Sequence, residues 1–202
     1  MDLNFWMFLE WFGACAALSG AVMMASHKVK PVFPWLLWIF SNIFYIILFS
    51  HTKQYGMLFM NMGGFIINLF GCYQWIQHAT KINKQITNLL LLLTVFFALI
   101  SLYYSINFLI EPTLKNAEWI GSSFGLTAAF LLASRHKYSF LCWFIWGFSN
   151  FVLLAVTLST RQYGIVFLQI GYMIINIYGA ITWLKKFNET HAFIPIDVPS
   201  QA

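Results

Sequence analysis

Seven continuous apolar runs, each about long enough to cross a lipid bilayer, dominate the sequence. A spanning helix needs about 20 mostly apolar residues, and runs of this kind cover residues 8–26, 33–50, 55–77, 86–110, 118–134, 138–159 and 163–184. They are continuously apolar and not alternating, which predicts helices instead of barrel strands. Only 8% of the residues are charged, whereas a soluble domain carries about 25%. We therefore expect an all-α membrane protein with seven transmembrane helices.

Basic residues gather in alternate connections between these runs. One side of the predicted membrane receives eight of them and the other side three: Lys28, Lys30, Lys81, Lys84, Arg135, Lys137, Lys185 and Lys186 against Lys53, Lys115 and Arg161. Cytoplasmic loops are enriched in Lys and Arg, so we expect the N-terminus outside and the C-terminus in the cytoplasm. The net charge of +5 forms no basic stripe, which argues against a nucleic-acid partner. The acidic start of the chain does not resemble a secretory signal, so the first run is expected to be a permanent helix.

The sequence also repeats itself at a fixed offset of 108 residues. Without a gap, about a third of the paired positions are identical between residues 10–76 and their counterparts 108 residues later, most densely in 10–13 and 118–121, 35–42 and 143–150, 54–56 and 162–164, and 66–75 and 174–183. Such self-similarity indicates an internal duplication. We expect a first three-helix repeat at 8–78, a linker helix with its loops at 79–117, a second repeat at 118–186 and a cytoplasmic tail at 187–202.

The linker helix decides how the two copies are oriented. Each copy has three spans, so one extra span between them lets both copies cross the membrane in the same direction. The prediction is a parallel 3+1+3 tandem repeat with a pseudo-twofold axis along the membrane normal. Parallel repeats of this kind occur in transporters, with the substrate near the midplane where the repeats meet.

Matching stripes of tryptophan and amide side chains mark the candidate site. Residues three, four and seven apart share one face of a helix, and the stripes are Trp35, Trp38 and Asn42 with Asn61 and Asn68, repeated as Trp143, Trp146 and Asn150 with Gln169 and Asn176. Amides at membrane depth need partners, because lipid offers none. One interpretation is a central pocket in which indoles stack on a flat ring and amides bind hydroxyls or an amide. The alternative is that amides bridge helices and tryptophans anchor the protein at the membrane interface.

These two interpretations apply unequally along the stripes. Trp38 and Trp146 lie a turn deeper than an anchor needs, which favours the pocket. For the other tryptophans and asparagines of the stripes near the cytoplasmic side, both interpretations stay open: Trp35, Trp143, Asn68 and Asn176. Asn61 and Gln169 differ between the copies, as an asymmetric ligand in a symmetric scaffold requires. Gly63, Gly71, Gly171 and Gly179 are expected to let helices approach closely.

The ionisable residues constrain the mechanism. Glu10 and Glu118 are interpreted as exposed carboxylates at helix N-termini, with attraction of a cation as the alternative. No Asp, Glu, Lys or Arg is predicted deep in a span, where coupled carriers usually place them, so uncoupled facilitated diffusion is favoured. No nucleophile–base pair or metal motif is present in the sequence, and Cys15, Cys72 and Cys142 are far apart. We therefore expect neither an enzyme nor a metal, disulfide or cofactor.

The arrangement resembles the SWEET-type architecture, and its motifs are similar to those of one family. Trp-x-x-Trp in the second helix of each copy, Tyr-Gly opening the third and Asn-x-x-Gly-x-x-x-Trp closing it resemble the Pnu family of bacterial vitamin transporters, of the PnuC type. The resemblance implies facilitated uptake of nicotinamide riboside across the inner membrane, trapping by phosphorylation inside the cell, and homo-oligomers, commonly trimers. The stripes above would then hold the substrate. Thiamine or riboflavin uptake, a sugar carrier and a non-transporting receptor remain alternatives.

Overall fold

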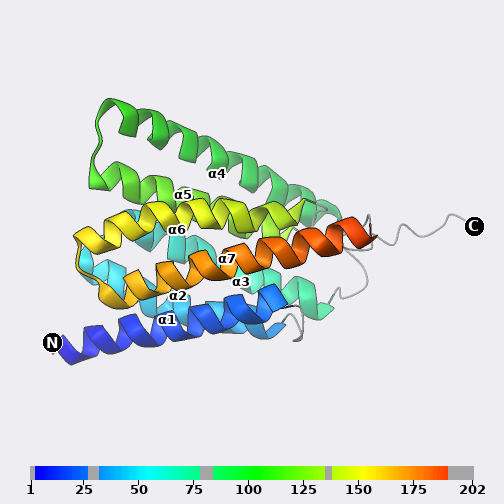
Figure 1. Ribbon diagram of the computed structural model, residues 1–202, viewed down its shortest axis with the longest axis horizontal. Coiled ribbons are helices and arrows are strands. Elements are labelled where there is room, and N and C mark those ends of the chain that lie inside the picture. Colours follow the sequence, from blue (N-terminus) through cyan, green and yellow to red (C-terminus); the bar gives the residue numbers. More distant parts are fainter. Residues whose placement is uncertain (1–2, 27–31, 78–83, 135–137, 191–202) are drawn as a thin grey trace, which may run out of the picture.

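The computed structural model describes residues 3–26, 32–77, 84–134 and 138–190, and nearly all of them are helical. Seven α-helices follow one another in this part of the chain: α1 (Leu3–Ser26), α2 (Val32–Thr52), α3 (Tyr55–Gln77), α4 (Lys84–Ile110), α5 (Leu114–Ala133), α6 (Cys142–Ser159) and α7 (Tyr163–Thr190), with a 3-10 turn, η1 (Ser139–Leu141), before α6. The helices form one bundle in which α1, α3, α5 and α7 run in one direction and α2, α4 and α6 in the other (Figure 1). We call the end where α1, α3, α5 and α7 begin the N-end, and the opposite end the C-end.

Helix packing follows the 108-residue offset. Helix α2 lies between α1 and α3, and α6 lies between α5 and α7 in the same way. These two groups of three helices, α1–α3 and α5–α7, meet at two equivalent places, where α1 packs against α7 and α5 against α3. Helix α4 packs against α5 at the edge of the bundle (Figure 1). The elements of the two predicted repeats therefore make matching contacts, with α4 outside both.

Close approach of the two groups depends on glycine. A Cβ built on Gly63 would lie 2.7 Å from a methyl of Leu126, and one built on Gly171 would lie 2.6 Å from the equivalent methyl of Leu18. These are the α3–α5 and α7–α1 interfaces. A larger residue at either glycine would push the two helices apart, as expected for small-residue packing in membranes.

Helix α5 differs from the other six in composition. Those six are long and apolar enough to cross a membrane, while α5 carries Lys115 and Glu118 and several buried hydroxyls. Its 20 residues still extend about 30 Å, the thickness of a bilayer core. Because α3, α4 and α6 surround it, little of α5 faces lipid, and its polar groups find partners inside the protein. Ser101 of α4, for example, donates a hydrogen bond to Ser123 at 2.9 Å.

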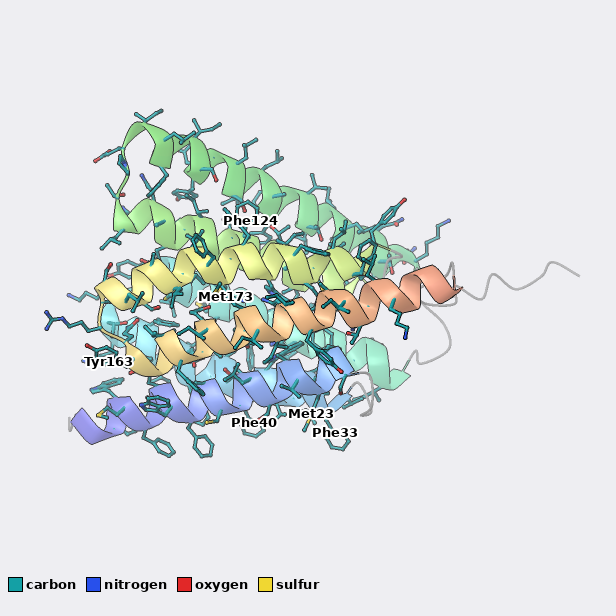
Figure 2. The ribbon with its side chains drawn as sticks, viewed as in Figure 1. Met23, Phe33, Phe40, Phe124, Tyr163 and Met173 are labelled. Atoms are coloured by element: carbon teal, nitrogen blue, oxygen red, sulfur yellow. The ribbon has the colours of Figure 1, made fainter. Side chains whose placement is uncertain are left out.

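The outer faces of the bundle are apolar, as a lipid-facing surface must be. Phe33 and Phe40 of α2 are 52% and 59% exposed and lie along the outer edge in Figure 2. In α4, only 17% of the most apolar stretch is buried, so most of this helix faces outward. The all-α membrane fold predicted from the apolar runs is confirmed.

Several predicted boundaries need correction. Helix α1 begins at Leu3 and α5 at Leu114, each earlier than predicted, so neither helix is short. The sixth span opens with the 3-10 turn and becomes α-helical only at Cys142. Helix α7 continues to Thr190, so the predicted tail from residue 187 begins as helix. Its remainder lies outside the described residues, and so do five of the eight basic residues on the more basic side: Lys28, Lys30, Lys81, Arg135 and Lys137.

Candidate functional site: a cavity between the two repeats

A cavity of about 130 Å³ lies at the centre of the bundle, lined by both groups of helices. Nine of the ten predicted site residues line it: Trp38, Asn42, Asn61, Asn68, Trp143, Trp146, Asn150, Gln169 and Asn176. Trp35 does not. Because α2 and α6 run opposite to α3 and α7, the cavity has Met57 and Ile165 toward the N-end and the tryptophans toward the C-end.

Trp38 and Trp146 meet across the centre. Their ring centroids are 5.8 Å apart with an interplanar angle of 63°. The indole N–H of Trp38 donates to the carbonyl of Ala17 at 3.1 Å, and that of Trp146 donates to the equivalent carbonyl of Gly125 at 3.0 Å. These bonds hold both rings at the cavity wall through their edge N–H groups, so the N–H needs no ligand and each ring can contribute stacking.

Trp35 and Trp143 are packing residues, and the interface-anchor interpretation is wrong for both. Each is only 1% exposed, whereas an anchor sits at the lipid–water boundary. The Trp35 ring lies against Gly71, where a Cβ would come within 2.7 Å, and Trp143 lies against Gly179 at 2.5 Å. Trp143 nevertheless also lines the cavity.

The amide pair that differs between the repeats also differs in bonding. The Nδ2 of Asn61 donates to the carbonyl of Met57, one turn earlier, at 2.8 Å. Gln169, at the equivalent position, has a buried Oε1 without a hydrogen-bond partner, and Asn176 has a buried Nδ2 in the same state. Both residues are 4% exposed. An unpartnered acceptor and an unpartnered donor on one face of α7 are therefore available to a ligand in the cavity.

Two further asymmetries were missed in the sequence. Tyr172 lines the cavity where the first repeat has Gly64, and Tyr45 lines it where the second has Leu153. Helical spacing contained the signal, since Tyr172 follows Gln169 by three residues and Tyr45 follows the asparagine of its stripe by three.

No Lys, Arg, His, Asp or Glu is among the described residues that line the cavity. The lining consists of aromatic and aliphatic side chains, amides and hydroxyls such as Ser41 and Ser149. No group of three or more potential metal ligands occurs in the described part of the chain. The site offers stacking and neutral hydrogen bonds, which is the chemistry of binding a small, flat, polar molecule.

Glu10 and Glu118 are not exposed carboxylates, as we had interpreted them, but half-buried links between the repeats. The backbone N–H of Met57, in the first turn of α3, donates to Glu118 Oε1 at 2.9 Å. The equivalent N–H of Ile165, in the first turn of α7, donates to Glu10 Oε1 at 3.0 Å. We call these two contacts the carboxylate clasps. Each carboxylate does sit at a helix N-terminus, but at that of the opposite repeat.

The clasps explain the glycine of the Tyr-Gly motif in each third helix. A Cβ on Gly56 would lie 3.1 Å from Glu118 Oε1, and one on Gly164 would lie 2.8 Å from Glu10 Cγ. Glycine therefore leaves room for the carboxylate to reach the helix end. Tyr163 itself is 65% exposed at the N-end (Figure 2).

Two matching groups of membrane helices that enclose an uncharged cavity at their interface are an arrangement found in multi-pass membrane transporters. The comparison with known families agrees with this class. The chain matches the family described as "Nicotinamide mononucleotide transporter" over residues 8–185, and it belongs to that family. No curated protein and no solved structure matches the chain. The predicted membership of the Pnu-type transporters is thereby confirmed.

Proposed function

We propose that this transporter carries nicotinamide riboside by facilitated diffusion. This compound is the nucleoside that lacks the phosphate of nicotinamide mononucleotide. The observation that carries the proposal is the uncharged lining of the cavity. A mononucleotide, which gives the family its description, bears a phosphate that proteins bind with Arg, Lys or helix N-termini. The N-termini of α3 and α7, which border the cavity toward the N-end, already hold the carboxylates of the clasps. A neutral ribose with a cationic ring fits this lining better.

The cationic pyridinium ring suits the pair Trp38 and Trp146. An indole face attracts a desolvated cation by about 2 kcal/mol, which supplies charge recognition in a cavity without acids. The carboxamide and the ribose hydroxyls both donate and accept hydrogen bonds, and so match Gln169 Oε1 and Asn176 Nδ2, which lack partners. Asn42 and Asn150 provide further amides on the walls.

The same lining supports transport without coupling to protons or sodium, because no described Asp, Glu, His, Lys or Arg lines the cavity, and coupled carriers usually place such groups at the site. For orientation we propose that the N-end faces outside. The three basic residues of the sparsely charged side lie at this end: Lys53 and Arg161 in connections and Lys115 in the first turn of α5. A bacterial inner membrane, a cytoplasmic C-terminus and a homo-oligomer are part of the same proposal.

Uptake into vesicles tests the proposal. Vesicles holding the purified chain are given labelled nicotinamide riboside outside, with thiamine, riboflavin, a hexose or nicotinamide mononucleotide in excess as competitors. We expect saturable uptake that stops at equal concentrations on both sides, unchanged by a proton or sodium gradient. Competition by unlabelled riboside should exceed that by the mononucleotide. Accumulation above equilibrium, or stronger competition by the mononucleotide, would contradict the proposal, and binding without flux would identify a receptor.

A further inference from the structure

The carboxylate clasps lie directly over the side chains that bound the cavity toward the N-end. Met57 and Ile165 are each 1% exposed and both line the cavity. The backbone N–H groups that the clasps hold belong to these same two residues. Each side chain is therefore kept in place over the cavity by a carboxylate from the opposite repeat.

The clasps also join the two interfaces that must move if the repeats rock against each other. Glu118 links α5 to α3, and Glu10 links α1 to α7, the two places where the groups pack together. Hydrogen bonds to a charged acceptor are stronger than neutral ones, and both interfaces carry one at the N-end. At the C-end, the described inter-repeat hydrogen bond is a neutral one, from Thr182 Oγ1 to the carbonyl of Ala25 at 3.1 Å.

We propose that Glu10 and Glu118 form the gate at the N-end of the cavity, closed when each carboxylate holds the first turn of the opposite repeat's third helix. Opening this end releases both clasps, so that α3 and α7 move away from α5 and α1 and carry Met57 and Ile165 off the cavity. Closing reforms them. The two clasps are equivalent in the two repeats, so they open together and close together. The proposal rests on the transport function of the family, but on no particular substrate.

Access of a thiol reagent to the cavity tests this gate without a substrate. In a chain with Cys15, Cys72 and Cys142 replaced by serine, Ala129→Cys places one small reactive thiol on the cavity wall. A membrane-impermeant thiosulfonate reagent is then added to intact cells, where it reaches one side of the protein, and to inside-out vesicles, where it reaches the other. The labelling rate is compared with and without Glu10→Ala and Glu118→Ala together.

The double variant should label about tenfold faster or more from the N-end side, since loss of a charged hydrogen bond shifts an equilibrium by at least that factor. Labelling from the other side should not rise. Glu111→Ala is the matched control, because this acid is exposed near the same end and its carboxylate takes part in neither clasp. Should the double variant fail to fold, the single Glu10→Gln and Glu118→Gln variants, which keep an acceptor oxygen, should show smaller rises of the same sidedness.

An unchanged rate from both sides would overturn the gate and leave the clasps a purely structural feature. An equal rise from both sides would do the same, because it would report general loosening. Failure of riboside uptake would refute the proposed substrate without affecting this result, so the two outcomes are distinguishable.

Discussion

Replacing Gln169 by methionine should stabilise the ligand-free protein while weakening substrate binding. Gln169 Oε1 is buried and has no hydrogen-bond partner, and a polar group in this state costs about 1–3 kcal/mol. Methionine has nearly the same volume and no such requirement. For a chain of 202 residues, where 1 kcal/mol corresponds to about 2–4 °C, the midpoint of thermal unfolding should rise by roughly 2–12 °C. Loss of one ligand hydrogen bond should raise the Kd about 2- to 12-fold.

The equivalent position in the first repeat provides the control. Asn61 already donates to the Met57 carbonyl at 2.8 Å, so Asn61→Leu removes a bond that is made and should lower the midpoint. Both midpoints are measured by tryptophan fluorescence on heating in detergent, and Kd by calorimetry with nicotinamide riboside. The reasoning is refuted if both variants change stability in the same direction, or if Gln169→Met binds the riboside as well as the native protein does.

The remaining predictions concern backbone positions. Gly179→Ala should destabilise the protein by about 1–3 kcal/mol, because the new methyl overpacks Trp143 at 2.5 Å. Its control is Gly147→Ala, whose methyl meets nothing closer than 4.0 Å and which should be neutral or stabilising in the same thermal assay. Equal losses of stability in the two variants would contradict the packing argument. Lys53 has a left-handed backbone with φ 57°, so Lys53→Gly should stabilise the protein by up to about 1 kcal/mol. The control Thr52→Gly, inside the last turn of α2, should destabilise the protein. A loss of stability in both variants would show that the conformation at Lys53 carries no strain.

Local sequence patterns predicted the helices and the side chains around the cavity. Continuous apolar runs define helices in lipid, and the spacing of Trp38 and Asn42, or of Gln169 and Asn176, puts each pair on one face. The 108-residue offset then indicated which faces belong to equivalent helices. These properties are local to a helix or repeated along the chain, so the sequence alone is enough to find them.

Features that depend on which helices become neighbours could not be predicted in this way. Glu10 and Glu118 looked like ordinary exposed helix-end acids, because the sequence does not say that α1 packs against α7 and α5 against α3. Trp35 looked like a possible anchor, since spacing does not give the rotation of α2 about its axis. Tyr172 was a different case: the spacing placed it on the correct face, but aromatic residues are so frequent in this chain that it did not stand out.

The central claim is that Trp38 and Trp146 recognise a cationic ring in an uncharged cavity. Its most direct test is the ratio of two dissociation constants, for nicotinamide riboside and for benzamide riboside, a neutral ring of the same shape, measured by calorimetry on the purified protein. A cation–π contribution of about 2 kcal/mol predicts that the charged riboside binds roughly 30-fold more tightly. Trp146→Leu should reduce that preference severalfold. Equal binding of the two ribosides by the native protein, or a preference that Trp146→Leu leaves intact, would contradict the account.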